Sequence, residues 1–313
     1  MKDSLQRFFI ALLVVAGVFI IYSRKWTKPQ ALDEIEHTQG GPQEEVPAEE
    51  PPVSEAAAAP VAAMTKSAKP VVAEKSVKAI PKGSTRPKDA LQFRMEDGVA
   101  VVQGDLVVGE LVEDDGTVEG GYVKMPTLNL WPSHVIPYFV DPGMREPDRV
   151  LKALDLFSGT VIQFVPFDGT QEDVMVFQEG TGICKSYVGR VGGKQPLWIA
   201  PGCRPDDIAH EILHALGLVH EQNRSDRDQF ITLNPENIEE QYQDNFFRLP
   251  PTLMTVSGLA PFDFESLMIY PTDMFSKNRQ PTMQSKIKDQ EIRPGATLSP
   301  RDIERVNKAY GGR

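Results

Sequence analysis

Three of the five histidines in this 313-residue chain, His210, His214 and His220, lie in one short segment. His210 and His214 are four residues apart, so on a helix both imidazoles project from one face, one turn apart. That spacing suits two ligands of one tetrahedral zinc ion. Glu211, beside the first of them, can reach a metal-bound water and act as a general base. The segment therefore predicts metal-assisted hydrolysis.

Gly217 follows His214 by three residues and can take a positive φ, which would end the helix and turn the chain back. The turn would bring His220 to the metal as third ligand, leaving the fourth position for water, as in catalytic zinc sites. The alternative is an amphipathic helix that carries imidazoles by chance. Composition predicts His-Glu-x-x-His in roughly one chain in a few hundred, and the added Gly217 and His220 lower that about a thousandfold. We therefore favour one catalytic Zn²⁺.

The elements that must position these residues begin at about residue 91. Alternating and clustered apolar residues predict two short strands around the turn at Gly104, and further strands within residues 134–141, 161–167, 173–178 and 196–202. Helical spacing predicts a helix within residues 146–159, Asn234-Pro235 marks the start of another, and Ser299, Pro300 and Asp302 cap a final one. The predicted fold class is α+β.

The N-terminal part differs in composition from this folded region. Residues 8–22 form an uninterrupted apolar run, which predicts a membrane segment within residues 1–26. It is either an uncleaved anchor, which the lack of an A-x-A-like site favours, or a cleaved signal peptide, and in both cases the remainder is exported. Residues 27–90, rich in Pro, Ala, Glu and Lys, predict a disordered linker that contains His37. The net charge of −11 argues against nucleic-acid binding.

Residues 210–228, HEILHALGLVHEQNRSDRD, resemble the astacin family of zinc metalloendopeptidases in the metzincin clan. The similarity spans about residues 120–313 and includes SLMIY at residues 266–270, which resembles the Met-turn of the family. It implies a metzincin-like fold with a twisted, mainly parallel sheet and an active-site helix. A smaller, irregular C-terminal subdomain that ends in a helix would complete it.

The resemblance also implies roles for single residues. Met268 would form an apolar floor under the zinc, and Tyr270 would be a switchable fifth ligand that stabilises the oxyanion. Glu221, after the third histidine, would receive the N-terminus freed by activation. Cys184 and Cys203, the only cysteines, correspond to one disulfide of the family, with two buried free thiols as the alternative. The second disulfide usual in the family cannot form here.

Latency is implied by VQGD at residues 102–105, which resembles the F-x-G-D segment of astacin propeptides with Val102 in place of Phe. In such segments the aspartate coordinates zinc and displaces the catalytic water, so Asp105 would inhibit a latent zymogen, although Gly-Asp is also a common turn pair. Residues 91–120 would be propeptide-like and residues 121–313 the catalytic domain. Activation would cleave between Asp105 and Trp131, around residues 120–124.

These features predict a zinc endopeptidase that acts on protein or peptide substrates, is inhibited by its own propeptide and meets the membrane through residues 1–26. Substrate is expected to lie along an edge strand near residues 186–189. Lys286 or Arg293 is a candidate for an acidic P1′ preference, with a surface role as the alternative, and His134 is predicted to be structural. The alternative function is a non-catalytic, envelope-tethered binding protein on a metalloprotease fold. Loss of Glu211 or Tyr270 would favour that alternative.

Overall fold

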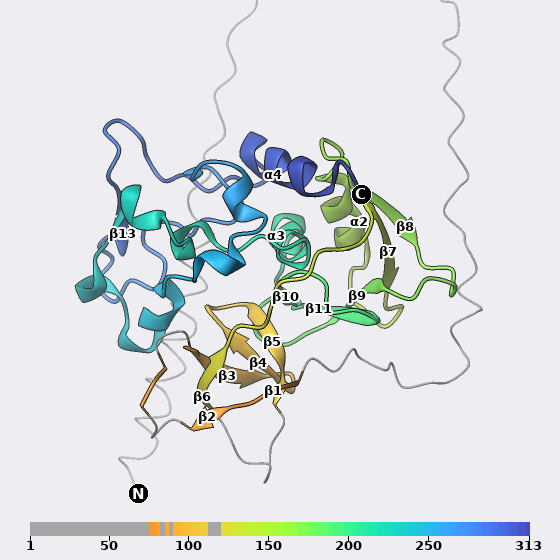
Figure 1. Cartoon of the computed structure of the whole chain (residues 1–313), viewed down its shortest axis with the longest axis horizontal. Coiled ribbons are helices and arrows are strands. Elements are labelled where there is room, and N and C mark those ends of the chain that lie inside the picture. The colour runs from red at the N-terminus through yellow and green to blue at the C-terminus, as the bar shows by residue number, and fades with distance from the viewer. Residues whose placement is uncertain (1–75, 82–84, 88–89, 112–119) are drawn as a thin grey trace, which may run out of the picture. The chain divides into compact units, whose positions relative to one another are not determined.

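The computed structural model describes residues 76–81, 85–87, 90–111 and 120–313 (Figure 1). The predicted membrane segment at residues 1–26 lies outside them, as does most of the predicted linker, His37 included. No helix within the described ranges is long and apolar enough to cross a membrane. Two short strands, β1 (Ser76–Val77) and β2 (Ile80–Pro81), fall inside the segment predicted as linker, so regular structure begins upstream of residue 91.

The sheet that supports the histidines is mainly parallel, as predicted. Strands β8, β7, β9 and β11 follow one another as parallel neighbours, and β10 pairs antiparallel to β11. Their bounds are β7 (Val135–Val140), β8 (Gln163–Pro166), β9 (Val174–Glu179), β10 (Lys185–Tyr187) and β11 (Lys194–Ile199). All but the short β10 were predicted from apolar alternation and clustering.

The N-terminal strands extend this sheet with antiparallel pairs, drawn in orange and yellow in Figure 1. They are β3 (Ala90–Glu96), β4 (Val99–Val102), β5 (Leu106–Leu111) and β6 (Gly120–Lys124). The two strands predicted around Gly104 are β4 and β5. Strand β5 pairs in parallel with β10, and the complete sheet is therefore mixed.

Three α-helices lie within the described part of the chain: α2 (Asp148–Asp155), α3 (Pro205–Ala215) and α4 (Pro300–Tyr310). Helix α2 buries Val150 and Leu154 in the same core cluster as Ile212 of α3 and Leu197 of β11. Burial of each such side chain contributes about 1.5–3 kcal/mol. The sheet and α2 thereby fix the position of α3.

Helix α4 begins with the predicted capping box. The Ser299 hydroxyl accepts a hydrogen bond from the Asp302 amide at 3.0 Å, and the Asp302 carboxylate accepts one from the Ser299 amide at 3.1 Å. These bonds satisfy amide groups that the first turn of a helix leaves without partners.

Between α3 and α4 the chain forms an irregular subdomain with a two-stranded sheet of β12 (Ile231–Leu233) and β13 (Met283–Ser285). The predicted α-helix at Asn234-Pro235 was wrong, because only 3-10 turns follow. The amide of Glu239 donates to Phe275 at 3.0 Å, whereas an α-helix would direct it to the Pro235 carbonyl. The 3-10 segments are η2 (Glu221–Asn223), η3 (Arg227–Gln229), η4 (Pro235–Asn237), η5 (Glu240–Phe246), η6 (Pro251–Leu253) and η7 (Ser257–Leu259).

Candidate active site

Helix α3 supplies His210 and His214, and its C-terminal turn redirects the chain toward the third histidine. The Gly217 amide donates to the His214 carbonyl at 2.7 Å, and the next amide, of Leu218, donates to Leu213 at 3.0 Å. This pair of bonds is the Schellman motif, which needs a left-handed residue at its centre. Gly217 has a φ of +100°.

Space as well as conformation requires glycine at position 217. A Cβ atom there would lie 2.9 Å from the Leu130 side chain and 3.0 Å from that of Val256. After the turn, the His220 Nε2 atom lies 3.1 Å from that of His210 and 3.3 Å from that of His214. The structure therefore brings together the three histidines that the spacing had grouped.

The three nitrogens fit one zinc ion. Zn–N bonds of 2.0–2.1 Å in a tetrahedron place ligand nitrogens about 3.3 Å apart, close to the separations here. Main-chain carbonyls lie by the opposite ring nitrogens, with Leu267 2.9 Å from His210 Nδ1 and Leu218 2.8 Å from His214 Nδ1. When Nδ1 donates its hydrogen to a carbonyl, the lone pair of Nε2 faces the centre of the cluster.

Asp105 is the fourth member of this zinc site. Its carboxylate oxygens lie 3.3 Å from His220 Nε2 and 3.6 Å from the Nε2 atoms of His210 and His214. Burial lowers the pKa of His214 to about 3, so this imidazole is neutral, as a metal ligand must be. Burial opposes the charge on Asp105, yet the neighbouring imidazoles hold its pKa well below the ordinary value. Lone pairs and a carboxylate that converge in this way suit a cation between them.

The chain around Asp105 fits closely against the subdomain. Gly104 has a φ of +102°, and a Cβ atom there would lie 2.8 Å from the Tyr270 hydroxyl oxygen. Tyr270 donates its hydroxyl hydrogen to the Gln103 carbonyl at 2.8 Å, and the Gln103 side chain donates to the Phe247 carbonyl at 2.8 Å. The glycine of the VQGD segment thus lets the backbone pass close to Tyr270.

Glu211 and Met268 lie beside the cluster in buried positions. The Glu211 residue is 2% exposed, and its Oε2 atom has no hydrogen-bond partner among the described residues. Burial raises the pKa of the Glu211 carboxyl well above its ordinary value, and the charge of Asp105 adds to that effect. Met268 is fully buried in the core cluster that contains the apolar face of α3, and the Tyr270 ring lies 4.9 Å from that of His220.

Glu221 ties the third histidine to α4. Its amide donates to the Met268 carbonyl at 2.9 Å, and its carboxylate lies 2.8 Å from a guanidinium nitrogen of Arg305. Both side chains are completely buried. Sequence reasoning missed Arg305; the available signal was a charged residue on the apolar face of the terminal helix, next to Val306.

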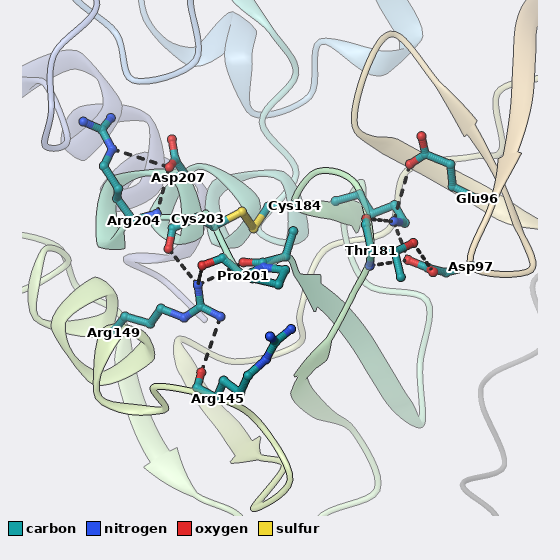
Figure 2. The surroundings of a disulfide bond; sticks show 12 residues. Glu96, Asp97, Arg145, Arg149, Thr181, Cys184, Pro201, Cys203, Arg204 and Asp207 are labelled. Atoms are coloured by element: carbon teal, nitrogen blue, oxygen red, sulfur yellow. Dashed lines mark hydrogen bonds and ion pairs between the residues drawn. A yellow bond between two sulfur atoms is a disulfide. The ribbon is translucent and has the colours of Figure 1, made fainter. Parts of the chain in front are cut away.

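Cys184 and Cys203 form the disulfide that the resemblance implied, and not two free thiols. Figure 2 shows the bond between the start of β10 and the loop that precedes α3. Arg149, from α2, donates to the carbonyls of Ala200, Pro201 and Cys203 at 2.9, 2.9 and 3.0 Å. The loop that leads into the metal-binding helix is therefore fixed from two sides, and the second, through Arg149, had no sequence signal.

The remaining charged candidates lie outside the cluster. The Lys286 side chain donates to the Asp228 carbonyl at 2.5 Å, and Arg293 pairs with its neighbour Glu291 at 2.5 Å. His134 lies 2.5 Å from the carbonyl of the C-terminal Arg313. Residues 120–124, where activation cleavage was expected, are strand β6, which pairs with β3 on one side and β2 on the other.

A family model described as Astacin, a peptidase family, matches residues 124–311. Zinc metalloproteinase nas-14 of Caenorhabditis elegans is 35% identical over 187 residues, which cover 58% of this chain and 37% of the relative. Astacin-like metalloprotease toxin 1 of Loxosceles intermedia is 33% identical over 231 residues, covering 68% of this chain and 82% of the toxin. The hatching enzyme zinc-protease High choriolytic enzyme 1 of the medaka fish Oryzias latipes matches with a TM-score of 0.51 and 30% identity, covering 59% of this chain and 94% of the enzyme.

The extent of these matches differs between relatives. The chain spans 37% of the length of nas-14 and 41% of zinc metalloproteinase nas-13, also from Caenorhabditis elegans. An alignment that covers 68% of a chain ending at residue 313 has to begin upstream of Asp105. The alignment with the Loxosceles intermedia toxin therefore extends upstream of the family-model match and spans Asp105.

Proposed function

We propose that this chain, which belongs to the astacin family of peptidases, is a zinc-dependent endopeptidase. The observation that carries the proposal is the convergence of three Nε2 atoms at 3.1 and 3.3 Å with Glu211 beside them. A structural zinc site needs no adjacent buried carboxyl, whereas hydrolysis needs a base. The presence of Glu211 and Tyr270 thus favours a protease over a non-catalytic binding protein.

His210, His214 and His220 would hold the zinc, which, when bound, lowers the pKa of water to about 7 and polarises a carbonyl. Glu211 would accept a proton from the attacking water and pass it to the nitrogen of the leaving amine. The Tyr270 hydroxyl, which donates to the Gln103 carbonyl here, would donate instead to the oxyanion of the substrate. Met268 would support the histidines from below as part of the core.

The test is a comparison of Glu211→Gln with the wild type after removal of the propeptide-like residues 91–120 and of everything upstream of them. We expect both proteins to bind one zinc per chain, and the variant to cleave a casein or peptide library about 10²- to 10⁴-fold more slowly. Met274→Gln, at an exposed subdomain position, serves as a matched control that should retain activity. Equal cleavage by Glu211→Gln would remove this residue from the mechanism, and no cleavage by the wild type would support the binding protein.

We also propose that the chain is made as a latent zymogen, with residues 91–120 as inhibitor and residues 121–313 as catalytic domain. Asp105 would take the zinc position that water needs. The carbonyl of Asp105 accepts a hydrogen bond from the Ser186 amide at 3.2 Å, and β5 pairs with β10 beyond it. Because β10 is the strand expected to bind substrate, the inhibitor would block both the metal and the substrate edge.

Activation would require a cut between Asp105 and Trp131. Bonds within β6 are held between two neighbouring strands, and proteases cut such bonds poorly, so we propose a site on either flank of β6. The freed N-terminus would then share Glu221 with Arg305. N-terminal sequencing of the processed chain would identify the cut, and sustained full activity of an uncut chain would contradict the proposal.

We propose, in addition, that the chain is exported. A disulfide at Cys184 and Cys203 suits an oxidising compartment, and residues 1–26 would anchor the chain to the membrane, or release it if they are cleaved. Extraction of the expressed full chain from membranes would separate these cases. Protein found only in the cytoplasm with reduced cysteines would contradict export.

A further inference from the structure

A buried lysine on β10, the strand between β5 and β11, has its carboxylate partners in the proposed inhibitory segment. The Lys185 side chain is fully buried, with its ammonium 2.6 Å from Asp97 and 3.5 Å from Glu96. Figure 2 shows Asp97 and Glu96 beside Thr181, whose carbonyl accepts from the same ammonium at 3.2 Å. Within the described residues 120–313, no carboxylate pairs with Lys185. Removal of the segment would therefore expose an unpaired cation.

Two aromatic residues continue this surface along the sheet. Tyr187 of β10 and Trp198 of β11 have ring centroids 5.8 Å apart. They belong to one buried cluster with Val99, Val101 and Val107 of the segment, so its valines cover both rings. Loss of the segment would uncover the aromatic pair next to the cation.

This surface lies on the face of the sheet opposite the metal-binding helix. Ser186, between Lys185 and Tyr187, directs its hydroxyl to the Glu211 carbonyl of α3 at 2.9 Å. Successive side chains on a strand alternate between faces, so Lys185 and Tyr187 point away from α3. An extended substrate paired with β10 would place every second side chain over this outer face.

We propose that Lys185, Tyr187 and Trp198 form a specificity surface of the processed enzyme for protein substrates, in which Lys185 binds an aspartate or glutamate and the rings bind an apolar side chain. The proposal rests on the proposed protease function. It concerns a site distinct from the zinc and from the P1′ candidates Lys286 and Arg293.

The chemistry of the substrate that this surface would bind follows from the residues that cover the surface in the latent chain. Asp97 lies in the turn between β3 and β4, and Val99 and Val101 lie on β4, so one hairpin presents a carboxylate and two β-branched apolar residues to this surface. Asp97 binds Lys185 and Thr181, whose hydroxyl donates at 2.6 Å, while Val99 and Val101 lie in the aromatic cluster. A substrate that presents a carboxylate and apolar side chains to this surface can replace those contacts, and a basic segment would face the lysine charge.

The experiment is cleavage profiling of a randomised peptide library with the processed chain and its Lys185→Met variant. We expect the wild type to favour Asp or Glu over neutral residues at one position by about tenfold, and Lys185→Met to lose that preference, measured as the ratio of acidic to neutral cleavage within each enzyme. Lys194→Met is the matched control. It removes one positive charge from the same face of β11, four residues from Trp198, and should keep the preference.

A second measurement uses only the wild-type processed enzyme, in case the buried lysine is needed for folding of the variant. A synthetic peptide of residues 94–102, which lacks Asp105 and so cannot reach the zinc, should inhibit cleavage of a protein substrate. Its Asp97→Asn form should inhibit about tenfold more weakly. Three results would refute the proposed specificity surface without contradicting the protease function. They are cleavage without an acidic preference, an unchanged preference in Lys185→Met, and equal inhibition by both peptides. Absence of all cleavage would instead overturn the proposed function.

Discussion

Replacement of Asp105 by alanine tests latency most directly, because it removes one side chain and leaves the three histidines in place. The carboxylate is 16% exposed and lies within 3.6 Å of three imidazole nitrogens. Removing one partner from a buried charged cluster costs about 3–5 kcal/mol. Since 1.4 kcal/mol is a factor of ten, the fraction of chains with an open metal site should rise roughly a hundred- to several-thousandfold.

The assay is the initial rate of hydrolysis of a quenched fluorescent peptide by the unprocessed full chain, with mass spectrometry to show that the chain remains intact. We expect Asp105→Ala to exceed the wild type at equal zinc content, with that factor as the upper bound because β5 still covers the substrate edge of β10. Glu110→Ala removes a carboxyl from the same strand, β5, without reaching the cluster, and should stay latent. An intact, zinc-bound Asp105→Ala chain as silent as the wild type would refute the inhibitory role, as would an equal gain in Glu110→Ala.

Three further predictions concern stability. Gly217→Val should lower the free energy of unfolding by about 2–4 kcal/mol and reduce zinc content, because a side chain at φ +100° is both strained and crowded; an unchanged melting temperature would contradict this. The double variant Cys184→Ser/Cys203→Ser, which opens a link across 19 residues, should lose about 3 kcal/mol in urea unfolding, and an equal midpoint would be the contrary result. Hydrogen bonds from Arg224 hold the pKa of Asp226 below 3.8, so the stability they provide is present above that pH and lost as pH falls through the lower folded value. Acid titration below about pH 4 should therefore destabilise the wild type more than Asp226→Asn. Equal losses of stability in the two proteins would show that the Arg224–Asp226 pair does not cause this effect.

Much of the site could be predicted from sequence because its geometry is local. The step from His210 to His214 is one helical turn, and the turn at Gly217 needs only a residue that tolerates positive φ. The capping box at Ser299 and the alternating strands on both sides of Gly104 are likewise properties of neighbouring residues. The physical cause of each of these features lies in residues that are close together in the sequence, so a short stretch of sequence is enough to predict it.

The features that were missed depend on contacts between distant segments. The α-helix predicted after Asn234 does not form, because the Glu239 amide donates its hydrogen bond to the carbonyl of Phe275, far along the chain. Arg149 and Arg305 act through carbonyls and a carboxylate on other elements, and a sequence window shows neither as anything but a charge. Lys185 is a similar case, since only the pairing of β5 with β10 brings Asp97 to it.

The pairing of β5 with β10 also determines whether a single activation cut would release the inhibitory segment. Cleavage beside β6 would break the chain but leave β5 on β10, the valines on the aromatic pair and Asp97 on Lys185. An intramolecular inhibitor would become a bimolecular one, whose release depends on dilution and on competition. A substrate that presents an acidic residue and apolar side chains to this surface would compete for these same contacts. The chemistry that retains the inhibitor would then also determine which substrates displace it.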